Sequence, residues 1–290
     1  MDFAPLYLKK NEDRRLRLGH LWVYSNEVDV QRSPLPGFSA GQQVQVIAND
    51  GKPLGMAYVN PHSLMCARLY SRQAGQALDR SLLVHRLNIA LSLRERLFAQ
   101  PCYRLVYGES DGLPGLVVDR FGEVLVVQIG TAGMEAVKEA IVEALDKVCK
   151  PAAILWRNDS SSRALEGLDS YVETALGELP ERLSLEENGT RFEVPAQGGQ
   201  KTGWFYDHRS NRQQVQQLAK GRRVLDVFSY MGGWGVQAAV AGAAAVTCID
   251  SSATALDQLE HNAALNGVGD RVATIQGDAF EALKALRAER

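Results

Sequence analysis

The chain has 290 residues, of which 46% are hydrophobic and 23% charged, and its formal net charge at pH 7 is −2. This composition is typical of a globular protein long enough for two or three domains. It excludes a protein coated in positive charge for indiscriminate nucleic-acid binding, so any contact with nucleic acid must come from local patches. No stretch reaches the roughly 18 uninterrupted apolar residues that a membrane span requires.

The N-terminal segment and the cysteines favour a cytoplasmic protein. The first residues lack a basic segment followed by an apolar run, so nothing predicts secretion. The four cysteines lie far apart, with no C-x-x-C pair and no histidine at metal-ligand spacing. We therefore expect a cytoplasmic location, reduced structural thiols, no metal and no membrane partner. The four residues are Cys66, Cys102, Cys149 and Cys248.

Residues 1–73 predict a small β-barrel domain, because short apolar runs alternate with turns. Strands are expected within 21–28, 34–60 and 64–71, and the Asp50-Gly51 dipeptide predicts a hairpin. A basic stretch precedes the first of these strands. It is either a contact surface for RNA or a solvated charged surface. The candidate RNA-binding residues are Lys9, Lys10, Arg14, Arg15, Arg17, His20 and Trp22.

Residues 74–183 predict a central α+β domain. A helix is expected to begin after Asp79, which is a suitable N-cap, and a second amphipathic helix covers 134–148. Between them, residues 103–130 alternate strands and turns. The polar segment 177–189 contains no recognised strand and predicts the boundary with the third region.

Residues 184–290 predict a Rossmann-like parallel sheet. After a strand at 190–196 and a helix at 207–219, strands and helices alternate, with strands expected at 222–228, 245–250 and 271–278. Such alternation is typical of parallel strands with helices on the faces of the sheet.

The stretch DVFSYMGGWG, residues 226–235, follows the first of these parallel strands. Ligands bind beyond the carboxyl ends of such strands, and glycines let the backbone approach them closely. The spacing of Gly233 and Gly235, with Asp250 at the end of the next strand, formally fits a dinucleotide fingerprint. However, residues 229–231 separate the glycines from the strand, whereas a dinucleotide loop places its first glycine almost directly after it.

S-adenosylmethionine suits the pattern better than a dinucleotide. It has a cationic sulfonium and amino group, two ribose hydroxyls and an adenine edge, but no pyrophosphate. Acids end three successive strands, so we expect Asp226 near the methionine portion, Asp250 at the ribose and Asp278 at the adenine amino group. Each acid alone could instead cap a helix or lie in a solvated turn.

Three stretches, residues 14–28, 199–212 and 224–239, resemble the large-subunit ribosomal RNA cytosine-5 methyltransferases that carry an N-terminal PUA domain. The resemblance implies a multidomain α/β protein with a PUA-like RNA-binding domain, a central α+β domain and a class I methyltransferase domain. It implies S-adenosylmethionine as cofactor and 23S-type ribosomal RNA as partner, and it leaves a homodimer open.

The resemblance also assigns cofactor-binding residues. It places Phe228, Ser229, Gly232 and Gly233 in the cofactor loop, beside Asp226 and Gly235 from the loop pattern itself, with Asp250 at the ribose and Asp278 at the adenine. From the second stretch it adds Thr202, Gly203, Tyr206, Asp207 and Arg209. His208 and Met231 depart from the residues common in relatives, and no general-base role is expected for His208.

Methylation at C5 of cytosine requires a Cys thiolate that adds to C6, because C5 by itself is a poor nucleophile. The base must also be extruded or single-stranded to reach the pocket. The family supplies a "DPP" segment and a Cys in a Ser-Cys-Ser context, and neither occurs here. None of the four cysteines aligns with that nucleophile.

We therefore expect no catalytic residue within residues 1–290, and a chain that is a fragment or truncated product with an incomplete methyltransferase sheet. The strand at 222–228 would then have an uncovered edge. Two alternatives stay open. The chain could be an RNA-binding fragment without catalysis, or an NAD-dependent oxidoreductase.

Overall fold

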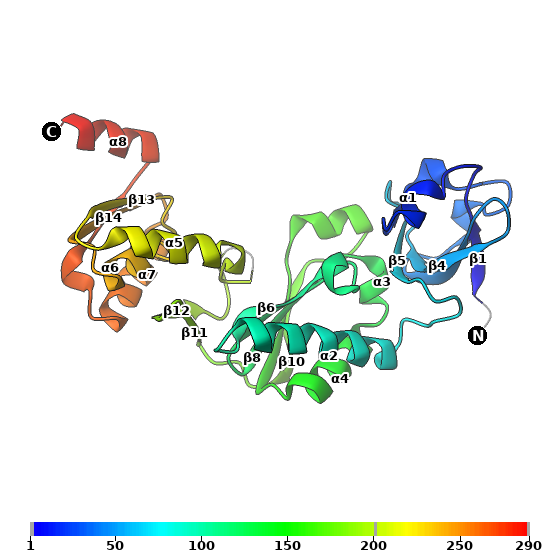
Figure 1. The fold of residues 1–290 in the computed structure, drawn as a ribbon, viewed down its shortest axis with the longest axis horizontal. Helices are drawn as coiled ribbons and strands as arrows, with labels where there is room; N and C mark the ends of the chain where they lie inside the picture. Colours follow the sequence, from blue (N-terminus) through cyan, green and yellow to red (C-terminus); the bar gives the residue numbers. More distant parts are fainter. Residues whose placement is uncertain (1–2, 200–201, 289–290) are drawn as a thin grey trace. The chain divides into compact units, whose positions relative to one another are not determined.

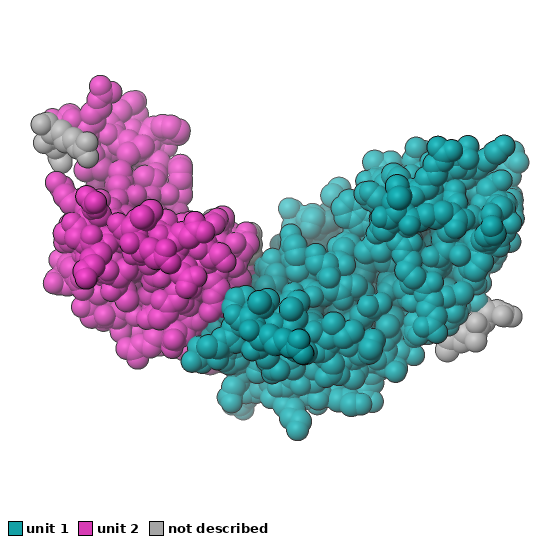
Figure 2. All heavy atoms as spheres, in the orientation of Figure 1, with its two compact units in different colours: residues 1–179 teal, residues 180–290 magenta. Residues whose placement is uncertain are grey.

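The computed structural model describes residues 3–199 and 202–288. The chain divides into two compact units, residues 1–179 and 180–290 (Figure 2). This division falls just before the strand Arg182–Glu187, whereas the predicted boundary at residue 183 would fall inside that strand. Among the described residues, no helix is long and apolar enough to cross a membrane.

The N-terminal part of the first unit is a five-stranded sheet in the order β1-β3-β4-β5-β2. β1 is parallel to β3 and the other pairs are antiparallel. The Asp50-Gly51 hairpin joins β3 to β4, as predicted. The strands are β1 (Ala4–Tyr7), β2 (Trp22–Val23), β3 (Gln42–Ile47), β4 (Pro53–Val59) and β5 (Ala67–Ser71), with helix α1 (Arg14–Arg17) and the 3-10 turns η1 (Ser25–Glu27) and η2 (Leu35–Gly37) between them.

The strand expected over 21–28 is shorter than predicted. It ends at Val23 because the next residues form η1. The buried carboxylate of Glu27 accepts a hydrogen bond from the backbone N–H of Tyr24 at 2.8 Å, which closes this turn.

A second five-stranded sheet follows, in the order β10-β9-β8-β7-β6, with only the β8–β9 pair parallel. Helices α2 and α4 contact one another and share one hydrophobic core with this sheet (Figure 1). α2 begins where predicted, since the N–H of Leu82 donates to Oδ1 of Asp79 at 2.9 Å. The elements are α2 (Arg80–Leu97), β6 (Cys102–Tyr107), η3 (Gly108–Asp111), β7 (Leu116–Phe121), β8 (Val124–Ile129), α3 (Ala132–Glu135), α4 (Lys138–Cys149), β9 (Ala153–Asn158), η4 (Ser161–Glu166) and β10 (Tyr171–Gly177).

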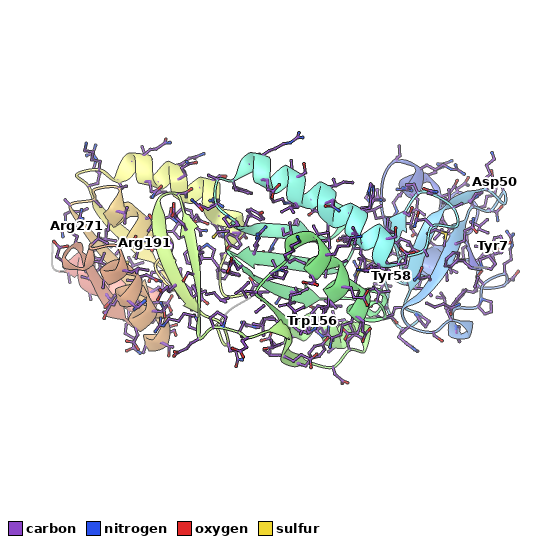
Figure 3. All side chains as sticks on the ribbon, turned by 90° about the horizontal axis from the view of Figure 1, so that it is seen from below. Tyr7, Asp50, Tyr58, Trp156, Arg191 and Arg271 are labelled. Atoms are coloured by element: carbon purple, nitrogen blue, oxygen red, sulfur yellow. The ribbon has the colours of Figure 1, made fainter. Side chains whose placement is uncertain are left out.

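The two sheets of the first unit are joined through buried contacts. Tyr58 of β4 and Trp156 of β9, both labelled in Figure 3, belong to the same hydrophobic core. The hydroxyl of Tyr58 also donates to the carbonyl oxygen of Pro114 at 2.7 Å. These contacts explain why residues 1–179 form one unit although the sequence predicts two domains there.

The second unit contains an antiparallel hairpin and a parallel sheet in the order β13-β14-β15. The parallel pairing confirms the Rossmann-like prediction. Among the described strands β13 pairs only with β14, and Leu225 on β13 is 45% exposed. The elements are β11 (Arg182–Glu187), β12 (Thr190–Pro195), η5 (Tyr206–His208), α5 (Arg209–Ala219), β13 (Arg223–Val227), α6 (Gly235–Val240), β14 (Ala245–Asp250), α7 (Ala253–Leu265), η6 (Gly269–Arg271), β15 (Val272–Gln276) and α8 (Ala279–Ala288).

The hairpin corrects the prediction for segment 177–189. β11 alternates buried and exposed residues, with Leu183, Leu185 and Glu187 buried, which is the period of a half-buried strand. Its turn is Asn188-Gly189, with φ of +52° and +74°, a dipeptide that favours two-residue hairpins. The polar members of this alternation are typical of a linker, which is why the composition of the segment did not predict a strand.

Candidate functional site

A cavity of about 320 Å³ lies at the carboxyl ends of β13 and β14, where the parallel sheet predicts a ligand site. Its size is within the range of roughly 300–1,000 Å³ that is typical of small-molecule sites. Three segments form its wall: the region around η5, the glycine loop, and the end of β14. The lining residues are Trp204, Phe205, His208, Arg212, Phe228, Ser229, Tyr230, Gly233, Trp234, Asp250 and Ser251.

Two glycines of the loop are required by close packing. A Cβ on Gly232, which has φ of +84°, would lie 2.7 Å from Cγ2 of Val236 and 2.8 Å from Cγ of Leu259. A Cβ on Gly235 would lie 2.5 Å from Sγ of Cys248. The loop therefore packs directly onto β14 and α7, and of the three predicted glycines only Gly233 lines the cavity.

Asp226 is hydrogen-bonded to the end of the glycine loop. Its carboxylate is buried and accepts a hydrogen bond from the N–H of Gly235 at 2.8 Å, at the start of α6. Burial raises its pKa to about 6, and the nearby charge of Asp250 acts in the same direction. Asp226 is not among the described residues that line the cavity, so its predicted contact with the methionine portion stays a prediction.

Asp250 lies in the cavity wall at the end of β14. Its two carboxylate oxygens accept hydrogen bonds from the N–H of Tyr230 at 2.8 Å and of Ser252 at 2.9 Å. These bonds fix the carboxylate between the loop and α7. A carboxylate has about four acceptor sites, so this one can still accept hydroxyl groups of a ligand.

Asp278 is exposed and caps α8, since its Oδ1 accepts hydrogen bonds from the N–H groups of Phe280 and Glu281 at 2.9 and 3.1 Å. It does not line the cavity described here. Its predicted contact with adenine stays a prediction.

Aromatic rings make up much of the wall. Phe228 and Tyr230 both have left-handed backbones, with φ of +62° and +49°, a conformation that costs energy for residues other than glycine. Tyr230 meets Phe205 edge to face at 5.6 Å, and Phe228 is 72% exposed. Such rings can hold a flat heterocycle or contact a cation through their π faces.

The segment 202–212 contributes to the wall, but through other residues than those predicted. The lining members are Trp204, Phe205, His208 and Arg212. The five predicted members share the segment without lining this cavity, and their role in cofactor binding stays a prediction. These five are Thr202, Gly203, Tyr206, Asp207 and Arg209.

Sequence reasoning missed the group that anchors this segment. Glu187, at the end of β11, is fully buried. Its carboxylate accepts hydrogen bonds from Nε and Nη2 of Arg212 at 2.6 and 3.0 Å, from Nε1 of Trp204 at 3.2 Å and from Nε2 of Gln237 at 2.8 Å. One carboxylate thus positions two residues of the cavity wall. The signals in the sequence were the alternation of β11 and the Asn188-Gly189 turn that follows Glu187.

The predicted RNA-binding residues differ in their surroundings. Lys10, Arg14 and His20 are exposed. The others bond within the first unit: Lys9 to the carbonyl oxygen of Asn26, Arg15 to Glu27, Arg17 to Asp13 and Trp22 to Glu109. RNA contact stays a prediction for all seven. In the part of the chain that the structure describes, no group of three or more His, Cys, Asp or Glu residues could hold a metal ion.

Comparison with known proteins identifies the family. A PUA-like domain model matches residues 6–72, and an S-adenosylmethionine-dependent methyltransferase model matches residues 113–289. Ribosomal RNA large subunit methyltransferase I from Erwinia tasmaniensis is 38% identical over 290 residues, covering 98% of this chain and 72% of that protein. The chain belongs to the S-adenosylmethionine-dependent ribosomal RNA methyltransferases. The same-named protein from Shewanella amazonensis is 37% identical, covering 97% of this methyltransferase and 72% of its own length.

Solved structures show the same fold. A structure described as a SAM-dependent methyltransferase from Streptococcus mutans superposes with a TM-score of 0.82 at 22% identity, covering 99% of this methyltransferase and 74% of that chain. Another, determined in complex with SAH, has a TM-score of 0.84 at 21% identity, with coverage of 99% and 73%. The methyltransferase is thus a multidomain α/β protein with a PUA-like domain, and its cofactor is S-adenosylmethionine. The NAD-dependent alternative is wrong.

Proposed function

We propose that this methyltransferase acts on large-subunit ribosomal RNA and that its target atom is C5 of a cytosine. The cavity at the ends of β13 and β14 supports binding of the cofactor, because a glycine loop, a hydrogen-bonded carboxylate and aromatic side chains meet there. The names of the relatives and the PUA-like domain support ribosomal RNA as the substrate.

S-adenosylmethionine fits the residues present. Its sulfonium supplies an electrophilic methyl group. Asp250 would accept hydrogen bonds from the ribose hydroxyls, and the rings of Phe228 and Tyr230 would contact the adenine or the sulfonium. A Cβ on Gly233 would lie 3.3 Å from Cη2 of Trp204 and 3.5 Å from Nη1 of Arg212, so a glycine here lets the loop pack closely against these two residues of the wall.

None of the four cysteines has the surroundings of a nucleophile. Burial raises the pKa of Cys66 to about 12 and of Cys149 to about 11, and it also raises the pKa of Cys248, which lies behind the glycine loop. Cys102 is buried in β6. We therefore assign the residues of this chain to holding cofactor and RNA, and assign the thiolate step to none of them.

This observation favours a second candidate function, in which residues 1–290 by themselves bind ribosomal RNA and cofactor without transferring the methyl group. Incubating the chain with methyl-labelled S-adenosylmethionine and unmodified large-subunit ribosomal RNA separates the two. Label recovered as 5-methylcytidine by nucleoside mass spectrometry supports the first function. Label on another nucleoside contradicts the C5 assignment, and binding of RNA and S-adenosylhomocysteine without transfer supports the second candidate.

A further inference from the structure

A second cavity, of about 340 Å³, lies in the first unit, far along the chain from the cofactor residues. It is bounded by the ends of β6, β8 and β9 and by the start of β7. β8 and β9 are parallel, so their carboxyl ends meet at this edge of the central sheet, which is the edge where ligands bind in open sheets with parallel strands. None of the residues assigned to cofactor binding lines this cavity.

The floor of this cavity is built from buried polar side chains. Arg157 and Asn158, at the end of β9, are 2% and 1% exposed. Oδ1 of Asn158 accepts a hydrogen bond from the N–H of Ile129 at 2.6 Å, and the carbonyl oxygen of Arg157 accepts one from Nε2 of Gln128 at 3.1 Å. These bonds hold the end of β9 against β8. Buried polar groups are costly unless they are hydrogen-bonded.

The charges of the floor are largely balanced. Arg157 pairs with Asp159 at 3.3 Å, and Arg163, which is also 2% exposed, pairs with Glu135 at 3.0 Å. The carboxylate of Glu109 lies in the wall as well. A bare anion is therefore a poor match. A mixture of donors and acceptors is instead what the edge of a nucleic-acid base requires.

One aromatic side chain, Tyr107, lines this cavity. It is the last residue of β6 and is 58% exposed. Its backbone N–H donates to Oδ2 of Asp111 at 2.7 Å, and the guanidinium of Arg104 lies 5.6 Å from the centre of its ring. An exposed ring on a fixed backbone beside polar groups is the usual platform for stacking an unpaired base.

One residue of the cavity wall is hydrogen-bonded to the predicted RNA-contact stretch. Oε1 of Glu109, in its wall, accepts hydrogen bonds from Nε1 of Trp22 at 2.7 Å and from Nη1 of Arg68 at 3.0 Å. Trp22 is the last residue of the basic stretch.

We propose that this cavity takes one unstacked nucleotide of the ribosomal RNA substrate, with its base stacked on Tyr107 and its polar edge bonded to the floor formed by Arg157 and Asn158. The inference rests on the proposed RNA substrate. It adds a recognition site in the central sheet that is separate from the cofactor cavity and from the surface of the PUA-like domain.

Filter binding of transcribed large-subunit ribosomal RNA to the 290-residue chain tests it. Tyr107→Ala is expected to weaken binding about tenfold, the loss of one stacked base, without changing the slope of affinity against salt, because no phosphate contact is removed. Tyr107→Phe keeps the ring and should bind like the parent. Leu165→Ala removes another exposed apolar side chain, 77% exposed in η4 and outside the lining, and should have no effect.

The outcomes are distinct. If the parent chain binds the RNA and Tyr107→Ala binds equally well, or if Tyr107→Phe is as weak as Tyr107→Ala, the stacking site is overturned while the proposed substrate stands. If the parent does not bind the RNA at all, the proposed substrate itself fails and the inference falls with it. Binding of free cytidine monophosphate as tight as that of the RNA would make the cavity a mononucleotide site and overturn the proposal. Unchanged thermal unfolding of Tyr107→Ala excludes misfolding.

Discussion

Asp226 brings a carboxylate into the interior of the second unit, where burial raises its pKa to about 6. In the unfolded chain the pKa of an aspartate is about 3.9. Between these two values the folded state binds more protons than the unfolded state, so this residue makes stability fall as pH rises through the window from about 4 to 6. The loss amounts to about 3 kcal/mol at most.

Asp226→Asn is therefore expected to flatten the pH dependence of unfolding between about pH 4 and pH 6, because the amide oxygen still accepts the hydrogen bond from Gly235 and carries no charge. Urea unfolding across this range, followed for the second unit, measures the effect. Asp278→Asn, at an exposed helix cap, controls for the loss of one carboxylate. An equal slope in the parent and in Asp226→Asn would show that burial of this carboxylate does not govern the pH response.

At the scale of single residues, the members of the glycine loop that line the cavity were easier to predict from the sequence than the lining residues of segment 202–212. Gly233 and Asp250 follow from the glycine pattern and a strand end, whereas Phe228 and Ser229 were implied by the resemblance to the family, and all four line the cavity. Trp204 and Arg212 could not be assigned in this way. Their position depends on Glu187, which is distant in sequence and approaches only when the hairpin folds against α6.

The hairpin β11–β12 is the element that holds the wall of the cavity at the ends of β13 and β14. Arg191, labelled in Figure 3, ties β12 to the end of α7 through the carbonyl oxygen of Leu265 at 3.1 Å. At the other strand, Glu187 bonds Arg212 and Trp204. The hairpin thus transmits the position of α7 to the segment 202–212.

Glu187→Gln is expected to destabilise the second unit by about 3–5 kcal/mol, because it leaves the guanidinium of Arg212 buried without its counter-charge. Affinity for S-adenosylhomocysteine should fall as well, since two residues of the wall lose their anchor. Glu186→Gln, on the neighbouring exposed position of β11, is the matched control. Urea unfolding and calorimetric titration measure both effects, and identical results for the two variants would rule out the anchoring role.

Among elements, the strands and helices of the parallel sheet were predictable from their periodicity, and so were the β3–β4 hairpin and the N-cap of α2. The β11–β12 hairpin was not found, although Asn188-Gly189 signals it. The reason is physical. Glu187 is polar but buried through four hydrogen bonds, so it occupies an inward position that a hydrophobicity pattern reserves for apolar residues.

The molecule as a whole divides into two compact units. We therefore expect a ligand that binds one unit to raise the free energy of unfolding of that unit and not of the other. S-adenosylhomocysteine at about 100 times its Kd should stabilise the second unit by about 2.7 kcal/mol and leave the first unchanged. Differential scanning calorimetry then shows one transition moving and another fixed. NAD at the same concentration is the control and should move neither. A joint shift of all unfolding would contradict the independence of the units.

The left-handed backbones of Phe228 and Tyr230 have a consequence for engineering this methyltransferase. A glycine at either position would take the same φ without steric cost, and at Phe228, whose ring is 72% exposed, little packing would be lost with the ring. Both rings line the cavity. A directed-evolution screen that rewards heat resistance alone would therefore tend to replace Phe228, and the surviving variants would lose part of the cavity wall.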